Sequence, residues 1–153
     1  MGLIIPIMGS WPTLFITGGT IMLFAVVILV LTDWGIPLVR DLRKPQPVFW
    51  KLPGGKGEVT EKPEESAVRE LAEEIGVKLS ASDLRLVVKQ DRGTHELFVF
   101  QANVSPEALG DVKHCGAEGE EIGIFSPQEI LEMRDFFPNH LGFVKEALTS
   151  CIS

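Results

Sequence analysis

The chain has 153 residues, a length typical of one domain with a single core. Its formal charge of −7 at pH 7 argues against a protein that binds nucleic acid, because such proteins usually present basic surfaces. The two cysteines, Cys115 and Cys151, form no recognisable framework, so we expect reduced thiols in a cytoplasmic protein rather than a disulfide.

The first 32 residues contain no charged side chain, and residues 14–31 are apolar over a length that could cross a membrane. Gly18, Gly19 and the missing basic flank argue against a membrane helix or a signal peptide. Residues 24–31 are rich in β-branched side chains, which favours a strand buried on both faces. We therefore expect a strand over residues 22–32 and no membrane partner.

The rest of the chain alternates short apolar runs with turn residues, which indicates a series of further elements. Strands are predicted over residues 36–40, 48–52, 83–90, 96–104 and 121–125, and helices after Ser126 and over residues 139–151. Residues 1–20 are apolar but interrupted by proline and glycine. They are predicted to form an N-terminal extension, a candidate surface for a homodimer, ahead of a domain of residues 21–153.

The notable basic side chains gather around the predicted loop between the second and third strands. Arg40, Lys51 and Lys56 are candidates for holding substrate phosphates, and Trp50 could stack on a base. The alternative is a solvated loop with no role in binding.

The stretch of residues 55–77 contains the pattern of a short helix. Pro63 suits the first helical position and Gly76 the C-terminal cap. At about 100° per residue, one face carries three carboxylates: Glu70, Glu73 and Glu74. The opposite face is apolar and is expected to pack on the core: Val68, Leu71, Ala72 and Ile75.

Three converging carboxylates repel one another, and a hard divalent cation with oxygen ligands removes that repulsion. The helix therefore predicts a Mg²⁺ site, for which Mn²⁺ could substitute. The alternative is an acidic helix face in solvent.

The same stretch carries a long fixed pattern. Gly55 is followed after five residues by Glu61, and after seven more by Arg69-Glu70-Leu71, then Glu73-Glu74 and Gly76-Val77. This pattern, with its Leu52-Pro53-Gly54-Gly55 lead-in, resembles the complete signature box of the Nudix hydrolase family. The resemblance implies an α/β fold, the Nudix α/β/α sandwich with a mixed curved β-sheet. The family usually has Ser or Thr where Lys62 stands, so a less well capped helix start is expected.

The resemblance also implies roles for individual residues. Gly55 and the three glutamates would bind the metal ion, and Arg69 would pair with a box glutamate, of which Glu61 is the candidate. Catalytic roles are implied for Arg69, Glu73 and Glu74. A base could come from Glu74 or from the loop before the last strand, where Glu118 fits best and Glu120 and Glu121 are the alternatives.

The implied substrate is a small nucleotide. ADP-ribose-cleaving members carry a proline where this chain has Arg92, and the tyrosine of diadenosine-polyphosphate members is missing. We therefore expect a MutT-like enzyme that splits a (d)NTP into NMP and pyrophosphate. The alternatives are an ADP-ribose or nucleotide-sugar pyrophosphatase and a non-catalytic nucleotide-binding module. His95 and His140 belong to no pattern.

Overall fold

The computed structural model describes residues 23–109 and 119–152, with only the backbone for residues 150–152. The predicted extension of residues 1–20, Glu118 and Cys115 lie outside the described residues.

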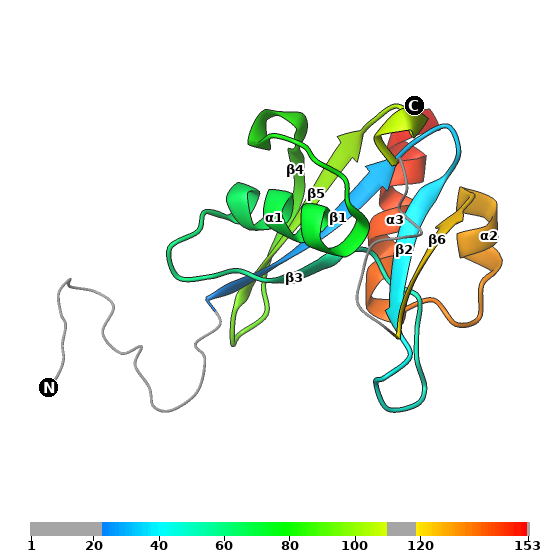
Figure 1. Cartoon of the computed structure of the whole chain (residues 1–153), viewed down its shortest axis with the longest axis horizontal. Helices are drawn as coiled ribbons and strands as arrows, with labels where there is room; N and C mark the ends of the chain where they lie inside the picture. The colour runs from blue at the N-terminus through cyan, green and yellow to red at the C-terminus, as the bar shows by residue number, and fades with distance from the viewer. Residues whose placement is uncertain (1–22, 110–118, 153) are drawn as a thin grey trace, which may run out of the picture.

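The centre of the fold is a four-stranded mixed sheet with the order β3-β1-β5-β4 (Figure 1). Its strands are β1 (Phe24–Leu31), β3 (Gly54–Lys56), β4 (Arg85–Asp91) and β5 (Glu96–Asn103). Strand β1 runs parallel to β5 and antiparallel to β3, while β4 pairs antiparallel with β5. The predicted mixed sheet is therefore confirmed. A second, two-stranded antiparallel sheet joins β2 (Ile36–Asp41) to β6 (Glu120–Phe125).

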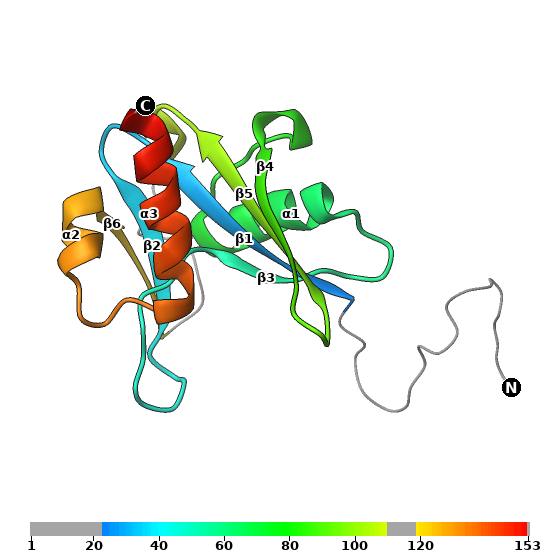
Figure 2. The same ribbon diagram turned by 180° about the vertical axis from the view of Figure 1, so that it is seen from behind.

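Helices cover both faces of the central sheet, which confirms the predicted sandwich. They are α1 (Pro63–Ile75), α2 (Pro127–Glu132) and α3 (Pro138–Ile152), with single 3₁₀ turns at Ala81–Asp83 and Pro106–Leu109. Figure 1 shows α1 in front of the sheet, and Figure 2, seen from the opposite side, shows α3 in front of it.

Strand β1 supplies core residues to both helical layers. Because successive side chains of a strand point to opposite faces, Val26 and Ile28 pack in the cluster that contains the buried side of α1. Val27 and Leu29 pack in the cluster that contains the buried side of α3. The predicted strand buried on both faces is confirmed, and residues 24–31 of the apolar run form β1 of the sheet. No helix in the described part of the chain is long and apolar enough to cross a membrane.

The prediction of a strand over residues 48–52 is wrong. This segment forms only isolated bridges, from Trp50 to Phe136 and from Lys51 to Val39, and the strand that joins the sheet begins at Gly54. The reason is the close approach of two backbones: a Cβ at Gly54 would lie 2.1 Å from the carbonyl oxygen of Val26. Only glycine fits there, so the sheet pairing falls on residues that have low intrinsic strand propensity.

Helix α1 has the predicted bounds but a slightly different buried face. Ala67, Leu71 and Ile75 are fully buried, whereas Ala72 is exposed. Ala72 lies about 100° around the helix from Leu71, at the edge of the apolar stripe, so its assignment to the packed face is wrong. At the start of the helix the Lys62 side chain makes no capping bond, as predicted, and the Lys62 N–H instead donates to the Glu65 carboxylate at 2.8 Å.

Two neighbouring substitutions in α1 test this packing. Leu71→Ala should lower the free energy of unfolding by about 2–5 kcal/mol, because it leaves a cavity in the core. Ala72→Gln should change it by less than about 0.5 kcal/mol, because the side chain can extend into solvent. Urea unfolding followed by circular dichroism measures both. A large loss from Ala72→Gln would contradict the observed orientation of the helix.

Candidate active site

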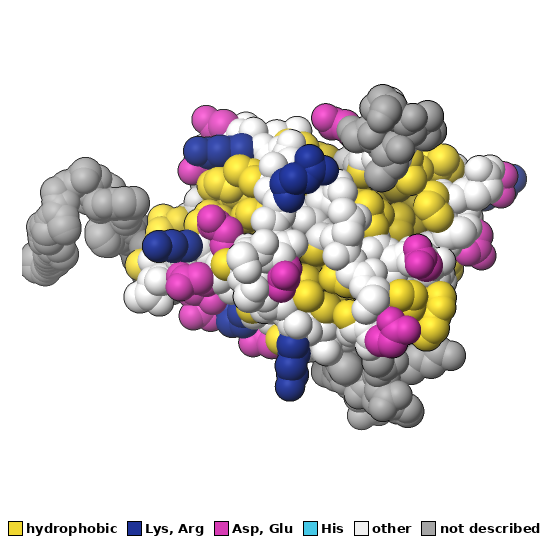
Figure 3. Space-filling model, turned by 90° about the horizontal axis from the view of Figure 1, so that it is seen from above, with side chains coloured by type: hydrophobic (Ala, Val, Ile, Leu, Met, Phe, Trp, Pro, Cys, Tyr) yellow, Lys and Arg dark blue, Asp and Glu magenta, His cyan; other side chains and the backbone are white. Residues whose placement is uncertain are grey.

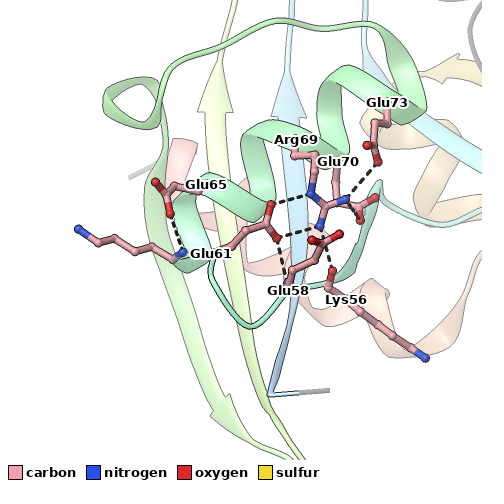
Figure 4. Close-up of polar contacts among 8 residues, drawn as sticks. Lys56, Glu58, Glu61, Glu65, Arg69, Glu70 and Glu73 are labelled. Atoms are coloured by element: carbon pink, nitrogen blue, oxygen red, sulfur yellow. Dashed lines mark hydrogen bonds and ion pairs between the residues drawn. The ribbon is translucent and has the colours of Figure 1, made fainter. Parts of the chain in front are cut away.

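The guanidinium of Arg69 lies among three glutamates on the exposed side of α1 (Figure 4). Its Nε and Nη2 donate to the two oxygens of Glu61 at 2.6 and 2.9 Å, which confirms the predicted pairing. Its Nη1 donates to Glu70 and Glu73, at 3.1 Å each, and Nη2 also reaches the backbone oxygen of Lys56 at 3.2 Å. The hydrogen bond from Arg69 holds the pKa of Glu61 below its usual range. Arg69 therefore ties helix α1 to the loop before it.

The carboxylate of Glu74 lies against the start of strand β3. Its Oε1 accepts a hydrogen bond of 2.7 Å from the backbone N–H of Gly54. Burial raises the pKa of Glu74 to about 7, while the Gly54 hydrogen bond and the charge of Lys51 act in the opposite direction. This carboxyl group is thus close to half-ionised at neutral pH.

Glu70 approaches the next residue of the same strand. A Cβ on Gly55 would lie 2.5 Å from Glu70 Oε1, so the contact requires a glycine. Burial also raises the pKa of Glu70, with Arg69 lowering it and Glu73 raising it. Two partly buried carboxylates therefore face the backbone of two consecutive glycines.

The third glutamate of the helix face points elsewhere. The side chain of Glu73 is 59% exposed and pairs with Arg69. In the described residues, no three Asp, Glu, His or Cys side chains are grouped closely enough to hold an ion. The helix periodicity predicted that Glu70, Glu73 and Glu74 meet at a common point. In this structure Glu70 and Glu73 share Nη1 of Arg69, whereas Glu74 accepts from the Gly54 backbone, so the three do not form one group.

The residues at this place nevertheless fit a hard divalent cation. Carboxylate and carbonyl oxygens are the ligands that Mg²⁺ and Mn²⁺ prefer. A cation beside Glu70 and Glu74 would offset the burial that now raises the pKa of both groups. The cation would be held by Glu70, Glu74 and the Gly55 carbonyl. Metal binding by Glu73 stays a prediction.

Two cavities flank this site. The larger has a volume of about 610 Å³ and lies between β1, the loop before β3 and the start of α3; Lys51, Lys56 and Asn139 are among its lining residues. The smaller, of about 230 Å³, is lined by Glu74, Glu120 and Glu121. Asp41, Lys44 and Lys51 line both cavities. Charges of both signs therefore border the two glycines.

A model of the NUDIX domain matches residues 22–146. The chain belongs to the Nudix hydrolase family. The expected fold and family are thereby confirmed.

Two curated relatives are similar to part of this Nudix chain. A MutT-like protein of Streptomyces ambofaciens is 31% identical over 83 residues, which cover 54% of this chain and 51% of that protein. An 8-oxo-dGTP diphosphatase of Proteus vulgaris is 42% identical over 52 residues, which cover 34% and 46% of the two chains. The chain thus spans about half the length of the curated relatives it matches.

Solved structures show the same fold. A structure from work on MutT of Aliivibrio salmonicida and Vibrio cholerae superposes with a TM-score of 0.65 at 23% identity, covering 83% of this chain and 97% of that one. At this identity the likeness concerns the fold alone.

The predicted substrate-binding residues of this Nudix chain lie in different surroundings. Lys51 and Lys56 are exposed and line the larger cavity. Arg40 instead pairs with Glu121 at 2.5 Å and lies 4.4 Å from the centroid of the Trp50 ring. A phosphate at Arg40, or a base on Trp50, would have to displace these contacts, so both roles stay predictions. On the face seen in Figure 3, acidic and basic side chains are interspersed with apolar patches.

A buried histidine of the larger cavity has no signal in the sequence. His140 was assigned to no pattern, yet the structure buries it at 8% exposure beside the box loop. Its hydrogen-bond partner, Leu52, is 88 residues away in the chain, so no local spacing could have indicated the pair.

Replacing Gly55 should weaken the metal site without unfolding the protein. In Gly55→Ala the new methyl group displaces the flexible end of Glu70, so we expect Mn²⁺ affinity to fall by about 10- to 100-fold. Titration of Mn²⁺ by electron paramagnetic resonance measures the affinity. In the control Gly142→Ala, no described atom lies within 4 Å of the added Cβ, and affinity should be unchanged. Equal Mn²⁺ affinity in the wild type and Gly55→Ala would contradict the assignment.

The raised pKa of Glu74 predicts a pH-dependent stability in metal-free protein. Because this pKa rises from 4.5 to about 7 on folding, the folded state binds more protons than the unfolded state between these values. Stability is therefore lost as the pH rises through this window, by up to roughly 3 kcal/mol. Glu74→Gln removes the effect, so the variant should become increasingly more stable than the wild type from pH 4.5 to 8.

Urea unfolding in EDTA across this pH range gives the difference between the two proteins. Burial lowers the pKa of His140 from 6.5 to about 4, so His140 makes stability rise with pH over part of this range in both proteins. Subtracting one protein from the other removes this shared contribution. A difference that stays constant with pH would show that Glu74 titrates normally.

Proposed function

We propose that this chain is a Mg²⁺-dependent pyrophosphohydrolase that splits a (d)NTP into a nucleoside monophosphate and pyrophosphate. The observation that carries the proposal is the pair of partly buried carboxylates, Glu70 and Glu74, held against the backbone of Gly54 and Gly55. Burial disfavours their charge, so the arrangement is suited to a cation and its anionic ligand.

The cavities beside the glycines suit a nucleotide. A volume of about 610 Å³ falls within the range of pockets that hold small ligands. Lys44 and Lys51 line both cavities, where their ammonium groups could bind phosphate oxygens. The apolar wall formed by Ala25, Val27 and Leu97 could face a base or sugar.

The reaction exchanges one P–O bond for another and transfers one proton. The oxygen of a water molecule bonds to a phosphorus, the P–O bond to the departing pyrophosphate breaks, and a carboxylate accepts the proton of the water. A bound divalent cation would neutralise charge on the phosphates and acidify the water.

Glu74 could accept the proton, because its carboxylate lines the smaller cavity and accepts a hydrogen bond from the Gly54 N–H that holds it in place. Glu120 lines the same small cavity and is the alternative. Glu121 is already paired with Arg40, and Glu118 stays the prediction made from the family pattern. Arg69 would act by holding Glu61 and the box loop in place.

An activity panel with matched variants tests the proposal. The substrates are the dNTPs, NTPs, 8-oxo-dGTP, ADP-ribose and nucleotide sugars, each with Mg²⁺ or Mn²⁺, with products separated by ion exchange. We include 8-oxo-dGTP because one relative is an 8-oxo-dGTP diphosphatase. We expect a (d)NTP to give monophosphate and pyrophosphate.

Glu70→Gln should lower kcat/KM by roughly 100-fold or more, because it removes a charge from the metal site. An equal loss in Glu73→Gln would support the role that the family pattern implies for Glu73. Glu64→Gln, an exposed position in the first turn of the same helix, is the control and should stay within twofold. No turnover of any substrate would favour the non-catalytic nucleotide-binding module, and turnover of ADP-ribose or nucleotide sugars alone would change the substrate class.

A further inference from the structure

His140 joins the start of helix α3 to the loop before the box. Its Nδ1 accepts a hydrogen bond of 3.2 Å from the backbone N–H of Leu52. The ring packs edge-on with Phe137 at 4.9 Å and lies 6.0 Å from the ring of Phe143. These contacts fix the orientation of the imidazole.

The hydrogen bond also determines where the imidazole carries its proton. A backbone N–H can only donate, so Nδ1 must be unprotonated, and the proton of the neutral ring is on Nε2. Burial, with the nearby charges of Lys51 and Arg92, lowers the pKa of His140 to about 4, so the ring is neutral at physiological pH. His140 therefore presents one hydrogen-bond donor.

The residue that carries this donor lines the larger cavity. His140 is one of its lining residues, together with the box glycines Gly54 and Gly55. In the described residues no acceptor is recorded for Nε2, and Ser66 Oγ is the only fully buried side-chain atom without a partner. Nε2 therefore retains some exposure to solvent, and because His140 lines the cavity, a ligand bound there is the candidate acceptor.

We propose that His140 is a specificity-determining residue, which donates its Nε2 hydrogen to the 6-carbonyl oxygen of a purine or the 4-carbonyl oxygen of a pyrimidine in the larger cavity. The inference rests on the proposed function, since it assigns a base to the cavity beside the box. Guanine and uracil carry a carbonyl group at the position where 2,6-diaminopurine and cytosine carry an amino group. An amino group is itself a donor, so it would leave His140 unpaired.

Two pairs of substrates that differ at this one group test the proposal. We expect the wild type to prefer dGTP over 2,6-diaminopurine deoxyriboside triphosphate, or dUTP over dCTP, by about 10- to 100-fold in kcat/KM. Comparable kcat/KM values within both pairs would overturn the proposal.

Two variants separate the hydrogen bond to the ligand from the hydrogen bond to Leu52. In His140→Asn the amide oxygen can replace Nδ1 as the acceptor, while nothing replaces Nε2. This variant should lose the carbonyl preference and keep its melting temperature. His140→Gln can place an amide N–H near the position of Nε2 and should restore part of the preference. A preference that persists in His140→Asn would show that another group reads the base.

A binding measurement distinguishes failure of this inference from failure of the proposed function. In ¹H–¹⁵N spectra of wild-type protein, we expect dGMP to shift the Nε2 resonance of His140 more than 2,6-diaminopurine deoxyriboside monophosphate does. A shift without any hydrolysis would retain the role of His140 and reject the enzyme. Hydrolysis without a shift would retain the enzyme and reject the role of His140, and the absence of both would reject both.

Discussion

The site depends on how closely helix α1 approaches the two glycines of strand β3. At position 54 only glycine fits against the Val26 carbonyl, and at position 55 only glycine leaves room for the Glu70 carboxylate in its observed place. The same approach gives Glu74 its hydrogen bond from the Gly54 backbone. A side chain at either position would move the helix or its carboxylates, so the geometry of the acidic site is fixed by two missing Cβ atoms.

This approach places negative charge where it is not well solvated. Burial raises the pKa of Glu70 and Glu74, and in the described part of the chain the nearest compensation comes from Arg69 and Lys51. Arg69 contacts Glu61, Glu70 and Glu73, which holds the helix and the preceding loop together. The destabilising charge is tolerated because the apolar side of the helix, including Leu71 and Ile75, is fully buried.

Strand β1 connects the acidic site to the nucleotide-sized cavity. One set of its side chains supports α1 and the other supports α3, so the helix with the carboxylates and the helix with His140 are placed relative to the same strand. The backbone N–H groups of Leu52 and Gly54, two residues apart, donate to His140 on α3 and to Glu74 on α1. The loop before β3 therefore links the two helices through direct hydrogen bonds.

Local patterns in the amino-acid sequence were sufficient to predict several elements and one pairing. The β-branched run predicted β1, proline and glycine marked the ends of α1, and the spacing of the box indicated the family and the pairing of Arg69 with Glu61. The folded structure was needed to show that the strand begins at Gly54, that Ala72 is exposed, and that Glu73 and Glu74 have different partners. It alone brought His140 to Leu52 across 88 residues. The physical reason is that periodicity and turn chemistry act between near neighbours, whereas these features depend on the close packing of segments that are distant in the chain.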